Sequence, residues 1–144
     1  YAMSAYRAIA WSRATRIYHW TILGHDGAVS PSGERLPSYH VLRQFSNFIA
    51  DGARHLETAS GDSAVLSLAF SRPEGDFTVI LINTADSSRS MLLRGVASTS
   101  LSLTNGLQTT ESDPSQTVSG TAEDNGLRLE LPSQSITSVH VSSE

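Results

Sequence analysis

The chain has 144 residues, 39% of them hydrophobic and 17% charged, which is the composition of an ordinary folded domain. Its formal net charge of −4 offers no basic surface, so we expect no nucleic-acid partner. The sequence holds no cysteine, which excludes disulfides and thiolate metal sites, and no apolar run of membrane-spanning length, so we expect no membrane partner. The start at Tyr1 shows no secretion signal, and we expect a piece of a longer or processed protein.

The beginning of the chain predicts an amphipathic helix over residues 2–11, which are rich in helix-forming side chains. The apolar residues that recur on one face at helical spacing are Met3, Tyr6 and Ala10, with Ile9 beside them. Such a stripe predicts that this face packs against another element.

A strand and a loop are predicted next. Residues 16–23, with the sequence RIYHWTIL, are β-branched and aromatic, which is typical of a strand. Residues 24–36 contain the turn pairs Asp26-Gly27 and Ser32-Gly33, which indicate a loop.

A second helix is predicted from Pro37 to Asp51. Its apolar residues recur every three or four positions: Tyr39, Leu42, Phe45, Phe48 and Ile49. We expect Gly52 to end this helix in the left-handed conformation. The order helix, strand, loop, helix is the repeat of a (β/α) barrel.

From about residue 54 the apolar period changes to two. Leu127, Leu129 and Leu131 alternate with Arg128 and Glu130, so one face of this strand is buried and the other is solvated. Eight strands are predicted, at residues 54–58, 64–71, 77–84, 89–94, 100–104, 116–119, 127–131 and 136–141.

The turns between these strands indicate hairpins. The signals are Pro73 to Asp76, Asn105-Gly106 and Asn125-Gly126. Short strands at this spacing predict an antiparallel β-sandwich. Because residues 50–53 are too short for a flexible linker, we expect the second helix to pack directly against the sandwich.

Three segments carry a resemblance to a known family. The second helix and its end read PSYHVLRQFSNFIADGA over residues 37–53; residues 69–83 form a hairpin that ends in Asn83; and residues 131–139 form a closing strand that begins Leu-Pro-x-x-Ser. In this order they resemble the last barrel helix and C-terminal sandwich of clan-A glycoside hydrolases, most closely family 30. With the strand that contains Trp20, the resemblance extends over nearly the whole chain.

The resemblance implies where the chemistry lies. In such enzymes two catalytic carboxylates stand at the ends of the fourth and seventh barrel strands, and residues 16–23 would be the eighth strand. Both carboxylates would then lie upstream of Tyr1, and no catalytic residue is assigned here. The resemblance also implies that Trp20 floors the sugar subsite nearest the scissile bond, since a flat indole suits the C–H face of a pyranose. The alternative for Trp20 is a buried aromatic on a core strand.

His25 and Asp26 follow that strand, where barrel loops carry function, and are candidate residues of the active-site rim. His19, His25 and Asp26 do not have a recognised metal-ligand spacing. Residues 123–126 are acidic but lack the spacing of a calcium loop. We therefore expect no metal and no other cofactor.

Independent catalysis has little support in the sequence. No G-x-S-x-G motif indicates an activated serine. The pairs Asp26 with Glu34 and Glu111 with Asp113 are expected to be solvated loop carboxylates.

The predicted fold is mainly β: residues 53–144 form an antiparallel β-sandwich, and residues 1–52 form a helix–strand–helix segment like the last unit of a (β/α)8 barrel. The predicted function is the non-catalytic C-terminal portion of a retaining β-glycoside hydrolase, supporting or shaping its barrel. Expected partners are a β-linked glycan, through the parent enzyme, and the missing barrel or a second copy, through residues 1–52. Secretion is expected from the family alone.

A stand-alone carbohydrate-binding or interaction domain is the alternative. Such modules usually stack sugars on exposed Trp or Tyr, and the only aromatic residues of the predicted sandwich are Phe70 and Phe77.

Overall fold

The computed structural model describes residues 1–18, 21–73, 75–95 and 100–143. Within these residues, two helices precede nine strands. The elements are α1 (Ala2–Ala10), α2 (Pro37–Phe48), β1 (Arg54–Leu56), β2 (Val65–Ser71), β3 (Phe77–Asn83), β4 (Arg89–Leu93), β5 (Leu101–Thr109), β6 (Gln116–Thr117), β7 (Gly120–Glu123), β8 (Gly126–Leu131) and β9 (Ser135–Ser143).

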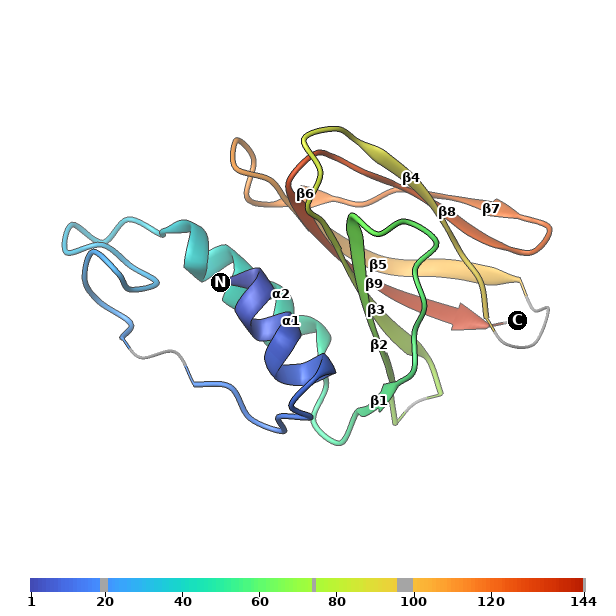
Figure 1. Cartoon of the computed structure of the whole chain (residues 1–144), viewed down its shortest axis with the longest axis horizontal. Helices are drawn as coiled ribbons and strands as arrows, with labels where there is room; N and C mark the ends of the chain where they lie inside the picture. The colour runs from blue at the N-terminus through green and yellow to red at the C-terminus, as the bar shows by residue number, and fades with distance from the viewer. Residues whose placement is uncertain (19–20, 74, 96–99, 144) are drawn as a thin grey trace.

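The strands form two sheets with antiparallel pairing throughout (Figure 1). The larger sheet has six strands in the order β1-β2-β3-β9-β5-β6, and the smaller has three in the order β4-β8-β7. Each of the eight predicted strands overlaps an observed one. The prediction of a mainly β fold with an antiparallel sandwich is confirmed.

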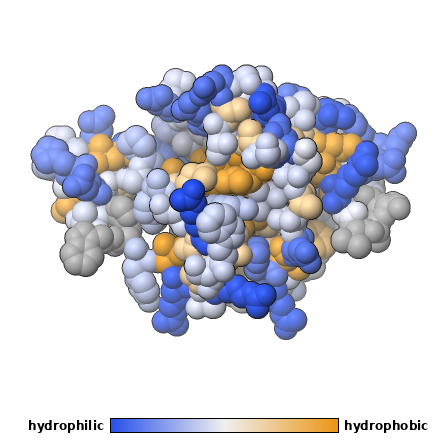
Figure 2. Space-filling model, viewed as in Figure 1, coloured by the Kyte–Doolittle hydropathy of each residue, from blue (hydrophilic) through white to orange (hydrophobic). Residues whose placement is uncertain are grey.

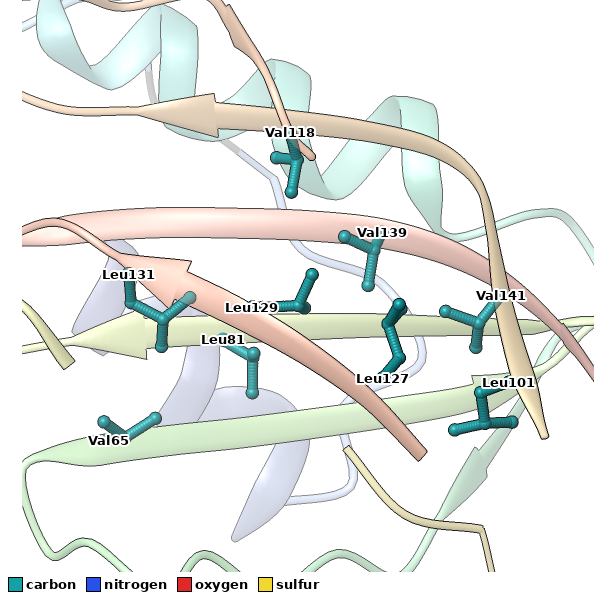
Figure 3. Packing of buried hydrophobic residues seen from close by; sticks show 9 residues of the cluster. All are labelled: Val65, Leu81, Leu101, Val118, Leu127, Leu129, Leu131, Val139 and Val141. Atoms are coloured by element: carbon teal, nitrogen blue, oxygen red, sulfur yellow. The ribbon is translucent and has the colours of Figure 1, made fainter. Parts of the chain in front are cut away.

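The first core fills the space between the two sheets (Figure 3). The small sheet contributes Leu127, Leu129 and Leu131 from alternate positions of β8, each at most 1% exposed. They pack against one face of the large sheet, which includes Leu81 and Val139. The period of two in the sequence therefore has the expected cause, because successive side chains of a strand point to opposite faces.

The second core lies on the other face of the large sheet, where the two helices cover it (Figure 1). Ile9 of α1 and Phe45 of α2 pack with Leu68, Ile80 and Ile136 of the sheet. The large sheet is thus covered on both faces, with helices on one side and the small sheet on the other. Direct packing of the second helix on the sandwich, predicted from the short junction, is confirmed.

The prediction of a strand at residues 16–23 is wrong for those of its residues that the structure describes. Residues 16–18, 21 and 22 have no strand structure, and Leu23 makes only an isolated bridge to Val29. A strand requires a neighbour to pair its backbone N–H and C=O groups. In a barrel those neighbours are adjacent parallel strands.

One of the turn predictions also differs from the structure. Asn105 and Gly106 lie inside β5, which runs past a register shift between Leu103 and Asn105. A Cβ on Gly106 would stand 2.7 Å from the Val118 Cβ, so glycine here permits close packing and not a turn. The hairpin at Asn125-Gly126 is confirmed, since it joins β7 to β8.

The second helix ends earlier than predicted. It stops at Phe48, and its cap residue Ile49 is extended, with φ −91° and ψ 103°. Gly52 is left-handed, with φ +76°, but it belongs to a separate turn in which the Ala53 N–H donates to the Ala50 carbonyl at 3.1 Å. The early end lets the Phe48 carbonyl accept a hydrogen bond from the Thr78 hydroxyl at 2.7 Å.

Candidate functional site

The candidate rim residues occupy the tip of a β-turn in the loop before α2. The Gly27 N–H donates to the Gly24 carbonyl at 3.0 Å, which makes His25 and Asp26 the two central residues of the turn. Both side chains are exposed. The third candidate, Trp20, lies outside the described residues. The structure thus brings His25 and Asp26 together as an accessible polar pair.

Backbone hydrogen bonds fold this loop on itself. The Ala28 and Val29 N–H groups both donate to the Ile22 carbonyl, at 3.0 and 2.8 Å, and the Leu36 N–H donates to the Ala28 carbonyl at 2.9 Å. A Cβ on Gly27 would stand 2.7 Å from the Ile22 carbonyl oxygen, so the loop packs too closely for a larger residue. The turn that carries the candidate residues therefore has a defined backbone.

A side chain from α2 fixes the loop to the helix. The Ser38 hydroxyl, in the first turn of α2, donates to the Gly27 carbonyl at 2.6 Å. His25 and Asp26 therefore stand next to the N-terminal end of α2. In a (β/α) barrel, the loop after a strand meets the following helix at the face on which substrates bind.

Residues at the start of the chain expose apolar surface. Among the described residues, the large hydrophobic side chains that are exposed are Tyr1, Trp11, Ile17, Tyr18, Ile22 and Leu23. Figure 2 shows apolar surface at the left end of the molecule, over the loop, in the middle, and toward the right, over the sandwich. No comparable side chain of the described sandwich is exposed.

A groove of about 1060 Å³ opens beside the same segment. Ile9 and Ile17 line it from the start of the chain, Phe45 and Ile49 from the end of α2, and Phe70 from β2. The groove and the His25–Asp26 turn lie toward opposite ends of α2, which is about 18 Å long by its 12 residues.

Buried polar side chains attach α2 to the large sheet. Gln44 is 0% exposed, and its Nε2 lies 3.1 Å from the Leu107 carbonyl, 3.0 Å from Thr109 Oγ1 and 3.4 Å from the Ile136 carbonyl. Sequence reasoning missed Gln44. The signal was available, because residues 41, 44, 45 and 48 form one helical stripe.

Asn83 explains two of the sequence segments that carry the family resemblance. It is 1% exposed, and its Nδ2 donates toward the carbonyls of Ser87, Leu131 and Pro132 at 2.9, 3.2 and 2.7 Å. The Ser135 hydroxyl donates to the same Pro132 carbonyl at 2.7 Å. The hairpin ending in Asn and the Leu-Pro-x-x-Ser segment are thus two sides of one contact, and their role is structural.

The other carboxylates that the sequence singled out have local structural partners or lie exposed. Asp113 accepts from the Ser115 N–H and from Gln116 Nε2, at 3.1 and 3.0 Å. Glu123 accepts a bidentate hydrogen bond from Arg128, which lowers the pKa of the Glu123 carboxyl. Asp26 and Glu34 are exposed.

Among the described residues, we find no further site based on histidine or on a metal ion. Burial lowers the pKa of His40, in the first turns of α2, and the positive charges of Arg43 and Arg35 lower it further. Across the part of the chain that the structure describes, no group of three His, Cys, Asp or Glu could hold a metal ion. Over the same residues, no helix is long and apolar enough to cross a membrane.

The comparisons with known proteins agree with this fold. A family model described as the glycosyl hydrolase family 30 beta sandwich domain matches residues 52–139. The chain therefore belongs to glycosyl hydrolase family 30 and carries its β-sandwich domain. The expected family is confirmed. Among curated proteins, none matches the chain.

Several solved structures share the whole arrangement of helices and sheets. The family 30 subfamily 8 xylanase from Clostridium acetobutylicum aligns with TM-score 0.87 and 18% identity, over 98% of this chain and 37% of that one. The family 30 endoxylanase from Clostridium papyrosolvens aligns with TM-score 0.80 and 22% identity, over 99% of this chain and 37% of that one. The catalytic domain of the family 30 xylanase C from Talaromyces cellulolyticus aligns with TM-score 0.87 and 19% identity, over 98% of this chain and 34% of that one. At these identities the likeness establishes the fold, and this chain spans about a third of each relative.

Proposed function

We propose that the chain is the C-terminal part of a retaining β-glycoside hydrolase, in which residues 1–52 complete a (β/α) barrel and the sandwich braces it. Membership of family 30 supports the class of enzyme, and the chain's coverage of about a third of related xylanases supports its place within a larger protein. Retaining hydrolysis uses two carboxyl groups about 5–5.5 Å apart, and the proposal places both in the rest of the barrel. Xylan is the first substrate to test, because three of the similar structures are described as xylanases.

The observation that carries the proposal is the uncovered apolar surface of residues 1–23. Ile17, Tyr18, Ile22 and Leu23 are 40 to 80% exposed, whereas the large apolar side chains of the described sandwich are buried or half-buried. Contiguous exposed apolar surface marks an interaction site. Adjacent barrel strands would pair with residues 16–23, and neighbouring barrel helices would fill the groove beside α1 and α2.

The loop before α2 would then lie at the mouth of the barrel. His25 and Asp26, at its exposed turn, would donate and accept hydrogen bonds with sugar hydroxyls, and Trp20 would stack on a sugar ring. None of these residues performs the bond cleavage in this proposal. Their contribution would be substrate affinity and positioning.

The first test is the size and activity of the native protein. An antibody raised against the chain would recover it from its source for intact mass and for xylan hydrolysis. We expect a mass several-fold above the 15.5 kDa of this chain, together with release of reducing sugar. The 144-residue chain alone should release none. A native protein of 15.5 kDa, or an active isolated chain, would contradict the proposal.

The second test addresses the loop within the native protein. We expect Asp26→Ala and His25→Ala each to lower kcat/KM on xylan about tenfold, or about 1.4 kcal/mol, without loss of folding. Asp124→Ala is the matched control, because Asp124 is also an exposed aspartate in a turn. Equal effects of Asp26→Ala and Asp124→Ala on kcat/KM would show that the loop does not contribute to substrate binding.

The same proposal predicts the behaviour of the isolated chain. Without a barrel, its exposed apolar surface would be covered by a second copy, as in domain exchange. Light scattering at micromolar concentration should show a dimer or higher oligomer, and a monodisperse monomer would count against it. We also propose that the parent enzyme is secreted, since polymeric glycans lie outside cells; cell fractionation tests this.

A further inference from the structure

We propose that Gln44 is a positioning residue, which sets the loop of residues 21–36 relative to the sandwich by fixing α2 in one register on the large sheet. The proposal concerns the geometry of this loop. Its importance for sugar binding rests on the function proposed above.

The first step is the attachment of α2. The Gln44 side chain projects from the middle of the helix, is 0% exposed, and offers its two N–H groups to acceptors on β5 and β9. Apolar contacts of Phe45 would tolerate small slips of the helix, because dispersion has little directional preference. Hydrogen bonds in a buried site do not, since a displaced amide would leave its donors unpaired.

The second step joins the helix to the loop. Ser38 lies six positions before Gln44, about 9 Å along the helix axis, and its hydroxyl holds the Gly27 carbonyl at 2.6 Å. Gly27 closes the turn that carries His25 and Asp26. A continuous set of contacts therefore runs from the sheet through Gln44, α2 and Ser38 to the candidate rim.

The experiment is amide hydrogen exchange on the 144-residue chain carrying Gln44→Met. Methionine keeps the length of the side chain and removes both donors. We expect the amides of Ala28 and Val29 to exchange at least tenfold faster, while the amides of β3 and β8 change less than threefold. Ser38→Ala should speed the same loop amides and leave those of α2 unchanged.

The matched control is Gln108→Met. Gln108 is also buried, at 7% exposure, but it lies on the face of the large sheet that packs against the small sheet. Its Nε2 donates to the Glu130 carbonyl of β8, in the small sheet, and to Thr137 Oγ1 of β9. It should lower overall stability without a selective effect on the loop. Equal loop exchange in the two glutamine variants, or an unchanged loop in Gln44→Met, would overturn the proposal. Since no activity is measured, either result leaves the proposed glycosidase function separately testable.

Discussion

The two parts of the chain differ in how completely they bury their own apolar surface. The sandwich, from β1 onward, pairs its strands and covers one face of its large sheet with a small one. Among the residues before Gly24 that the structure describes, six large hydrophobic side chains are exposed, and residues 16–18, 21 and 22 pair with no strand. The sandwich therefore has the properties of a complete domain, and the segment before it has those of one half of an interface.

This difference shows which part supports the other. The buried side chains of the helices lie on the face toward the large sheet: Ala5 and Ile9 in α1, and Gln44, Phe45 and Phe48 in α2. An isolated helix of the length of α1 or α2 is marginal in water and requires such packing. We infer that loss of the sandwich core unfolds the helices, whereas loss of a helix contact leaves the sandwich folded.

The largest effect is expected from Leu129→Ala. Leu129 is 0% exposed between the sheets, and its truncation should cost about 2–5 kcal/mol of unfolding free energy. Urea denaturation followed by circular dichroism measures this. Leu23→Ala is the matched control, because Leu23 is 68% exposed and its loss should change the stability of the isolated chain by less than about 0.5 kcal/mol.

A companion variant tests the direction of support. Phe48→Ala removes a buried contact on the helix side, where Phe48 is 4% exposed. It should release the helices to hydrogen exchange while the amides of β8 stay protected. Simultaneous loss of protection in both places would show one cooperative unit and remove the distinction between the two parts.

An intermediate effect is expected from Asn83→Ala. Asn83 is 1% exposed, and its side-chain amide donates to the carbonyls of Ser87, Leu131 and Pro132. Alanine would remove this donor from all three carbonyls. Leaving buried acceptors unpaired costs about 1–3 kcal/mol in unfolding free energy. Asn105→Ala serves as the control, because Asn105 is exposed on β5. Similar midpoints for the two variants would show that the Asn83 contact is dispensable.

The sequence was most informative where one physical rule decides the outcome. Alternation of Leu127, Leu129 and Leu131 predicted the buried face of β8, and the stripe of α2 predicted the burial of Phe45 and Phe48. By contrast β7, with the residues Gly-Thr-Ala-Glu, was missed because it has no apolar alternation and is paired along only one edge. Its strand conformation comes from pairing with β8.

Predictions failed where tertiary contacts or absent neighbours decide the structure. The aromatic run at residues 16–23 has strong strand propensity, but strand pairing needs partners that this chain does not provide for its described residues. The roles of Gln44 and Asn83 depend on segments distant in sequence, so local pattern could mark them as buried but not name their partners. For the candidate site, the sequence placed His25 and Asp26 in a loop with a turn signal at Asp26-Gly27. Only the structure showed the hydrogen bond from Gly27 to Gly24 that closes the turn, and the attachment of Gly27 to Ser38.

A smaller effect is expected from Thr78→Val on the helix side of the large sheet. Thr78 is 0% exposed, and its hydroxyl donates to the Phe48 carbonyl at 2.7 Å. Valine keeps the shape and removes the donor, which should cost about 1 kcal/mol. Thr78→Ser should restore most of it, as measured by thermal unfolding. If serine fails while valine is tolerated, packing of the methyl group and not the hydrogen bond holds this end of α2.

The smallest effect belongs to the exposed pair of Glu123 and Arg128 on the small sheet. Hydrogen bonding to Arg128 holds the pKa of Glu123 below its usual value. The ionised carboxylate of Glu123 is therefore more stable in the folded state than in the unfolded state, and it contributes to the stability of the fold. This contribution is complete above the unfolded pKa of about 4.3 and is lost as pH falls through the lower folded pKa. The stability of Glu123→Gln should therefore approach that of the unaltered chain as the pH falls below about 4, in thermal unfolding at low salt.

Because both groups are solvated and screened by salt, 1 M salt should reduce the neutral-pH difference as well. A difference that persists unchanged at pH 3 would mean that the glutamine acts through the β7–β8 turn and not through charge.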